Sequence, residues 1–262
     1  MKFNEVIEKA EEYLKKEAQP IIEKIREKKY GSIEEMLEPY KPNCTIEELE
    51  KMKEFDFKKT LLDRFCEQLQ NYQAMPRAIN YKANKRKILK KLESANNKDA
   101  LMQELGVDNN NFAWEKYAQG IIEAKKYINK TNFKENFLTS LKIINGASEF
   151  KTKLYEINKI KKIYGIGDAL KYDFFKELCC DNLCKPDVHI VDICKEIEGF
   201  NFSTENPKKD EIAEKFIELC DKKNVYYCDK ILWLCCTGNF YKDEIIITRI
   251  SKEAFFNFLM SN

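Results

Sequence analysis

The amino-acid sequence predicts an all-α protein. Apolar residues recur with the spacing of a helix face along most of the 262-residue chain, and strand signals are few. Two segments, Ser32–Glu35 and Thr45–Glu48, have the Ser/Thr-x-x-Glu pattern that opens helices. The composition, 44% hydrophobic and 34% charged, is that of a globular protein. These observations favour packed amphipathic helices.

The expected elements follow one another along the chain. Residues 2–29 carry apolar side chains at helical spacing and are expected to form one helix that ends at Tyr30-Gly31. Short helices are expected after the caps at Ser32 and Thr45. Residues 245–250 are rich in β-branched side chains and are expected to be extended. Further helices are expected over residues 57–72, 112–127, 132–144, 150–163, 188–198, 208–222, 229–236 and 251–259.

We expect three segments. Residues 1–56 form an N-terminal helical region that packs with the C-terminal helices, and residues 57–198 form a helical core. Residues 199–262 form a C-terminal helical region, which begins with a polar linker.

The sequence shows no segment suited to a membrane or to export. No run of about 18 apolar residues occurs, and the first residues lack an apolar signal region. The ten cysteines include the adjacent pairs Cys179-Cys180 and Cys235-Cys236, which favours reduced thiols over a disulfide framework. We therefore expect a cytoplasmic protein without a membrane partner.

The most informative stretch runs from Lys159 to Leu178. A basic helical segment leads into Gly165-Ile166-Gly167, and a second helical segment leaves it. Glycine tolerates positive φ and close backbone approach, so the triplet allows a tight turn between helices. The first amides of the second helix lack intrahelical partners and can bind a phosphate. A tight loop between two core helices is the alternative interpretation.

Local charge supports a phosphate site. The net charge of +2 is too small to indicate a nucleic-acid-binding protein, so such a function needs a basic patch. Lysines outnumber acids in the segment that leads into the turn: Lys151, Lys153, Lys159, Lys161 and Lys162. An earlier helix carries another basic run, typical of a solvated face and also suited to phosphate contacts: Lys82, Lys85, Arg86, Lys87, Lys90 and Lys91.

An aspartate follows the turn in the context Asp187-Val188-His189-Ile190. With the Gly-x-Gly turn about twenty residues earlier, this segment resembles the helix-hairpin-helix signature of the base-excision DNA glycosylase superfamily, which includes endonuclease III, adenine glycosylase and 8-oxoguanine glycosylase. The resemblance covers residues 150–195, with the helix-hairpin-helix itself in 150–180.

The resemblance implies a two-layer helical fold with the active site in the cleft between two helical subdomains. It implies that the protein flips a damaged or modified base out of double-stranded DNA, near the nucleoid, and that Asp187 supports hydrolysis of the N-glycosidic bond. Contacts to DNA are implied for Gly165, Ile166, Gly167, Lys162, Lys171 and His189. Considered without the family, an Asp at the start of a helix is an N-cap.

One departure from the family pattern affects the mechanism. Members that also cleave the DNA strand carry a Lys two residues beyond the second hairpin glycine, where this chain has Ala169. Without that amine, water is the expected nucleophile and the enzyme is monofunctional. A displaced amine, Lys171 or Lys185, is the alternative and would make a bifunctional glycosylase and lyase. A DNA-binding protein without catalysis is the third interpretation.

The resemblance also implies that an Asn or Gln at the end of an early helix fills the gap left by the flipped base. Gln70, Asn71 and Gln73 are candidates, and an ordinary polar helix terminus explains them equally well. Trp233 and Tyr172 are candidate pocket residues, although both aromatic side chains also suit a core.

We expect neither a cofactor nor metal ligands. His189 is the only histidine, which removes catalytic triads and di-histidine metal centres from consideration. Some relatives carry an iron–sulfur cluster after the catalytic Asp, and this chain does not reproduce their cysteine spacing with Cys220, Cys228, Cys235 and Cys236. Another group of cysteines suits either zinc or small core positions: Cys179, Cys180, Cys184 and Cys194. The carbonyl groups of the hairpin could also bind a structural cation.

Overall fold

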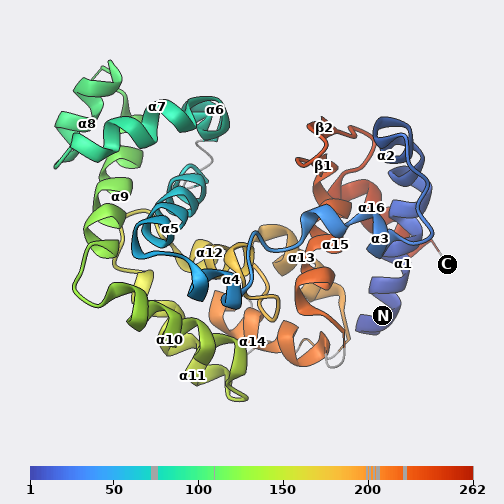
Figure 1. The fold of residues 1–262 in the computed structure, drawn as a ribbon. Coiled ribbons are helices and arrows are strands. Elements are labelled where there is room, and N and C mark those ends of the chain that lie inside the picture. The colour runs from blue at the N-terminus through green and yellow to red at the C-terminus, as the bar shows by residue number, and fades with distance from the viewer. Residues whose placement is uncertain are drawn as a thin grey trace. The chain divides into compact units, whose positions relative to one another are not determined.

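The computed structural model describes residues 1–71, 76–108, 110–198, 200, 202, 204, 207–220 and 223–261. These residues are mostly helical, and their only strands are the short antiparallel pair β1 (Asn239–Phe240) and β2 (Ile245–Ile246) (Figure 1). The all-α prediction is therefore confirmed. In the part of the chain described, no helix is both long and apolar enough to span a bilayer. The chain divides into two compact units, which we call the terminal unit (residues 1–42 and 181–262) and the central unit (residues 43–180).

The terminal unit is built around helix α15 (Val225–Thr237), which is buried along most of its length. Four other helices pack against it: α1 (Phe3–Glu17), α13 (Val188–Glu196), α14 (Lys209–Cys220) and α16 (Lys252–Met260). Helix α1 also contacts α16, so the N-terminal helix packs with C-terminal helices inside one unit.

Short elements complete the terminal unit: α2 (Gln19–Arg26), α3 (Ile33–Met36), η1 (Glu38–Tyr40) and the β1–β2 hairpin. An ion pair attaches the hairpin to these helices. Asp243 Oδ2 accepts hydrogen bonds from Arg26 Nη2 at 2.7 Å and from the Tyr40 hydroxyl at 2.8 Å. The Asp243 side chain is only 5% exposed, so its charge needs these donors.

The central unit is organised around helix α5 (Glu54–Leu69). Helix α5 packs against α7 (Tyr81–Ser94), α9 (Phe112–Ile128), α10 (Phe133–Gly146) and α12 (Asp168–Leu178). Aromatic side chains fill the contacts: the Phe65 and Phe174 rings stack with centroids 4.2 Å apart. The remaining elements are α4 (Ile46–Lys51), α6 (Pro76–Ile79), α8 (Lys98–Leu105), α11 (Phe150–Ile157) and η3 (Asn158–Ile160).

Both predicted N-caps are confirmed, and the capping box is complete at Thr45 but not at Ser32, where the Glu35 side chain accepts from the Gly31 amide instead. The Ser32 hydroxyl accepts from the Glu35 amide at 3.1 Å. Thr45 and Glu48 form a reciprocal box, in which the Thr45 amide donates to Glu48 Oε2 at 2.8 Å and the Glu48 amide donates to the Thr45 hydroxyl at 3.2 Å. These contacts need only residues three positions apart, which explains why the sequence predicts them.

Two predicted helix lengths are wrong. The single helix over 2–29 is interrupted at Ala18, because Pro20 lacks an amide hydrogen and is accommodated in the first turn of a new helix, α2. The helix expected over 150–163 ends at Ile157 and continues as the 3₁₀ turn η3. The segment boundary expected after residue 56 falls inside α5.

Candidate functional site

The glycine triplet forms the turn between η3 and α12. Gly165 has a φ of 88°, which only glycine adopts readily, and Gly167 is the extended N-cap of α12. The Ile166 amide donates to the Ile163 carbonyl at 3.0 Å, and the Ile166 side chain is 3% exposed. Gly167 is exposed, and no atom lies within 4 Å of the position that a Cβ would occupy there. The first turn of α12 is therefore open to a ligand on this side.

Helix α9 contacts the backbone of this turn. Glu123 Oε2 accepts a hydrogen bond of 2.6 Å from the Tyr164 amide. A Cβ at Gly120 would lie 2.7 Å from the Tyr164 carbonyl oxygen, closer than real Cβ atoms approach. Gly120 was not predicted from the sequence to be important, although a glycine inside a strongly helical segment often marks close packing.

Gly120→Ala is expected to lower the free energy of unfolding by about 1–3 kcal/mol, because the new methyl group overlaps the Tyr164 carbonyl. Gly146→Ala is the matched control. Gly146 is an exposed glycine at the end of α10 with no atom within 4 Å of its Cβ position, so alanine should be neutral or stabilise by up to about 1 kcal/mol. Urea unfolding followed by circular dichroism measures both variants, and equal effects would contradict the close approach.

Lysines gather beside the turn. The Lys130 and Lys162 ammonium groups each lie 5.1 Å from the centroid of the Tyr127 ring. Partial desolvation, followed by the positive charges of Lys130 and Lys159, lowers the pKa of Lys162. Lys159 is paired with Glu156 at 2.5 Å. Lys130 and Lys162 thus form a like-charge pair that a bound anion would stabilise.

One acidic residue lies at the start of α12. Asp168 is the first residue of the helix, where a carboxylate interacts favourably with the helix dipole. Its Oδ1 is 2.6 Å from Lys161 Nζ, and the hydrogen bond from Lys161 lowers the pKa of Asp168. A phosphate bound at this helix start would compete with Asp168 for Lys161.

Lys171 points into the protein. Its side chain is 0% exposed, and Nζ donates to Asn158 Oδ1 at 2.8 Å and lies 3.7 Å from Asp168 Oδ1. These contacts join α12 to η3. A DNA contact or a nucleophilic role for Lys171 would require the side chain to leave them. Ala169, the second residue of α12, has no amine.

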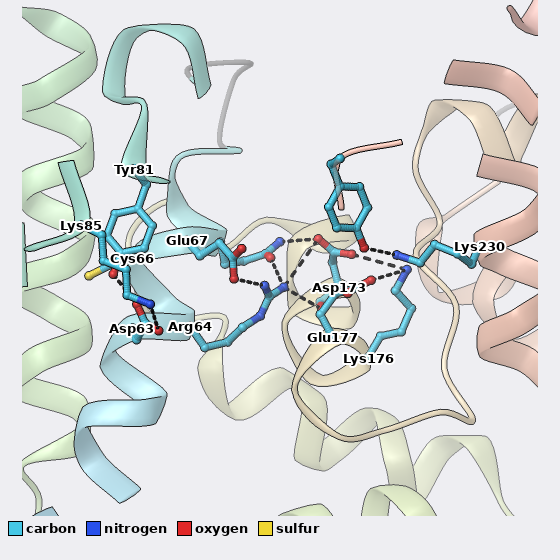
Figure 2. A network of polar contacts seen from close by, with 12 residues as sticks. Asp63, Arg64, Cys66, Glu67, Tyr81, Lys85, Asp173, Lys176, Glu177 and Lys230 are labelled. Atoms are coloured by element: carbon cyan, nitrogen blue, oxygen red, sulfur yellow. Dashed lines mark hydrogen bonds and ion pairs between the residues drawn. The ribbon is translucent and has the colours of Figure 1, made fainter. Parts of the chain in front are cut away.

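A buried ionic network braces α12 against α5 (Figure 2). Arg64 Nη2 donates to Gln68 Oε1 at 2.5 Å and to the Asp173 carbonyl at 3.2 Å. Gln68 Nε2 donates to Asp173 Oδ2 at 2.8 Å, and Lys176 Nζ lies 3.6 Å from Asp173 Oδ1. Although burial opposes the charged form, the pKa of Arg64 is raised, because the carboxylates of Asp173 and Glu67 outweigh desolvation.

This network was not predicted from the sequence. The sequence does contain one indication of the network. Arg64 and Gln68 are four residues apart and share the buried side of α5 with the apolar residues Leu61 and Phe65. Two polar side chains on a buried helix face need partners from another helix. Asp173 of α12 supplies them.

The candidates for filling the gap in DNA have different surroundings. Gln70 Oε1 accepts a hydrogen bond of 3.1 Å from the Tyr81 amide, so Gln70 links the end of α5 to the start of α7. Asn71 is exposed. Gln73 lies outside the described residues. Tyr172, a candidate pocket residue, is fully buried.

Asp187 is the N-cap of α13. Its Oδ1 accepts hydrogen bonds from the amides of His189 at 3.0 Å and Ile190 at 3.3 Å. The cap uses only this oxygen, and Oδ2 lies 4.0 Å from Lys185 Nζ. The preceding loop is held by the Lys185 amide, which donates to Asp229 Oδ1 at 2.7 Å. The carboxylate therefore has a defined position with one oxygen outside the cap.

Val188 and His189, which follow Asp187 in the chain, and the candidate pocket residue Trp233 differ in exposure and contacts. Val188, the first residue of α13, is 57% exposed. His189 is half-buried, and its Nδ1 is buried with no hydrogen-bond partner among the described residues. Trp233 is half-buried on α15 and meets Tyr241 edge to face, with ring centroids 6.1 Å apart.

The thiols behave as core groups. Burial raises the pKa of Cys66 to about 12. Burial, followed by the Asp187 carboxylate, raises the pKa of Cys236 to about 12. Both thiols are therefore protonated and unreactive at neutral pH. Within the described ranges, no three His, Cys, Asp or Glu side chains are arranged to hold a metal ion. The absence of a cofactor stays a prediction.

The predicted residues belong to both units. The turn, Lys162, Lys171 and Gln70 lie in the central unit, and Asp187 lies in the terminal unit together with Lys185, His189 and Trp233. No protein-family model matches this chain, and no curated protein and no solved structure is significantly similar to it. The resemblance to DNA glycosylases therefore depends on the motif residues between positions 150 and 195.

Proposed function

We propose that this chain is a monofunctional DNA glycosylase, which flips a modified base out of duplex DNA and hydrolyses its N-glycosidic bond. The observation that carries the proposal is the arrangement of Asp187. Two backbone amides hold Oδ1, while Oδ2 is left outside the cap beside Lys185. A carboxylate with a fixed position is the group that glycosidic cleavage requires.

Asp187 has a defined role in this proposal. Departure of the base builds positive charge on the deoxyribose, as in other glycoside hydrolyses. The Asp187 carboxylate stabilises that charge and orients the attacking water. Because α13 fixes the carboxylate, little reorganisation is needed when the charge develops.

The glycine turn supplies the contact to the DNA backbone. Gly167 leaves space at the first turn of α12, and Lys162, three residues before Gly165, adds positive charge together with Lys130. A phosphate would lower the repulsion between these two ammonium groups. His189, two residues after Asp187, is a further contact to the DNA backbone in this proposal.

A second candidate activity, cleavage of the DNA strand, is favoured by one observation. Lys185 Nζ lies 4.0 Å from Asp187 Oδ2, and the Lys185 side chain is 20% exposed. Lys171, the other candidate amine, is 0% exposed. A displaced nucleophile would therefore be Lys185, which would form a Schiff base with the sugar carbon and release the base.

The experiment is base release from duplex oligonucleotides that each carry one modified base: 8-oxoguanine, uracil, hypoxanthine, 3-methyladenine or thymine glycol. Each reaction is divided into an alkali-treated and an untreated half. Strand cleavage only after alkali is the expected result, because water attacks and an abasic site remains. Cleavage without alkali, together with a covalent adduct trapped by borohydride, would favour the lyase. Duplex binding without base release would favour a DNA-binding protein without catalysis.

A further inference from the structure

Helix α7 carries a basic surface that the proposed chemistry does not use. Six of its 14 residues are Lys or Arg, and Glu93 is the only acidic residue among them. Tyr81, Ile88 and Leu92 are buried and attach the helix to the central unit. The exposed basic residues are Lys82, Lys85, Arg86, Lys87 and Lys90.

Three of the basic residues on the flanks of α7 bind neighbouring groups. Lys85 Nζ lies 2.7 Å from Asp63 Oδ2, and the other oxygen of Asp63, Oδ1, accepts a hydrogen bond from the Tyr81 hydroxyl (Figure 2). Lys87 Nζ donates to the Leu105 carbonyl at 2.7 Å. Lys91 Nζ lies 3.8 Å from Glu104. The ammonium groups of Lys85, Lys87 and Lys91 on the sides of the helix therefore already have partners within the protein.

The outer face of α7 is different. Arg86 and Lys90 are four residues apart, so they lie about one turn apart on the same side, roughly opposite the buried Tyr81. Lys82 precedes them by another turn. Up to Lys90, this face contains no carboxylate. The charge of Arg86 and Lys90 is thus presented to solvent as a row.

Helix α9 holds both this basic helix and the glycine turn. Lys125 Nζ donates to the carbonyls of Leu92 at 2.7 Å and Ala95 at 2.9 Å, at the C-terminal end of α7. Gly120 and Glu123, within two turns of Lys125, contact the backbone of the glycine turn. Both surfaces therefore have a common support inside one unit.

We infer that the outer face of α7 is a second binding surface for the phosphate backbone of double-stranded DNA, with Arg86 and Lys90 as its principal contacts. A duplex carries one negative charge per about 1.7 Å of its axis, so cations repeated every turn of a helix, about 5.4 Å, can meet several phosphates. Such contacts position a duplex without reading its sequence. The inference rests on the proposed function for the choice of DNA as the polyanion.

The test is the salt dependence of binding to an unmodified duplex, measured by fluorescence anisotropy. The double variant Arg86→Gln/Lys90→Gln should reduce the slope of log K against log salt by about 1.8, since each phosphate contact contributes about 0.9. Between 50 mM and 200 mM salt, the parent protein should therefore lose about tenfold more affinity than the variant. The matched control Lys15→Gln/Lys24→Gln removes the same charge from exposed positions of α1 and α2 and should keep the parent slope.

Each outcome decides the inference. An unchanged slope in the α7 variant, or an equal reduction in the control, would overturn it. A variant that loses binding to phosphatidylserine vesicles and keeps its duplex slope would assign α7 to a membrane surface instead. Base release is measured in parallel on a modified duplex. If the α7 variant has a reduced slope and the parent protein releases no base, DNA binding by α7 is supported and the glycosylase proposal is contradicted. If the parent releases a base and the α7 variant keeps the parent slope, the glycosylase proposal is supported and DNA binding by α7 is contradicted.

Discussion

Asp187→Asn is expected to slow base release by about 10²- to 10⁴-fold, the usual contribution of a positioned acid or base, while the fold and the affinity for duplex DNA are retained. Asn is as good an N-cap as Asp, and its side-chain oxygen can still accept from the His189 and Ile190 amides. The negative charge that stabilises the sugar cation is lost. Single-turnover base release and thermal unfolding measure the two properties separately.

Asp187→Ala is the matched comparison, because it removes both the cap and the charge. It should lose activity and also about 1 kcal/mol of stability. The cap alone would explain Asp187 if Asp187→Asn released bases at the normal rate and only Asp187→Ala were less stable. In that case Lys185, whose ammonium lies 4.0 Å from Asp187 Oδ2, would be the next residue to replace.

Arg64→Met is expected to lower the free energy of unfolding by about 3–5 kcal/mol, the usual effect of removing one partner from a buried ion pair. The Arg64 guanidinium is buried and donates to Gln68 Oε1 and the Asp173 carbonyl. Without it, both oxygens lose a donor, and the Asp173 carboxylate loses a nearby cation. Urea unfolding monitored by circular dichroism measures the loss.

Lys59→Met is the control for Arg64→Met. It makes the same charge change at an exposed position of α5 and should alter stability by less than about 0.5 kcal/mol. A loss below about 1 kcal/mol in Arg64→Met would show that the network is solvated. Because Asp173 belongs to α12, the helix that follows the glycine turn, Arg64→Met should also weaken duplex binding.

Local features were readable from the sequence because each depends on neighbouring residues. The caps at Ser32 and Thr45 need a partner three positions away, and Gly165 needs only its own freedom to adopt a φ of 88°. The prediction of one long helix over 2–29 was wrong because the apolar residues keep their helical spacing past Ala18, while Pro20 does not allow an unbroken helix. That prediction followed the apolar periodicity and gave too little weight to Pro20.

By itself, then, the sequence determined the helical class, the caps, the glycine turn and the position of Asp187 at a helix start. The tertiary structure decided which charges are buried and which are exposed. Arg64 reaches Asp173 across 109 positions of the chain, and Lys171 is enclosed while Arg86 and Lys90 remain in solvent. Desolvation depends on the helices that pack around a side chain, and residue type and spacing along the chain do not specify those neighbours.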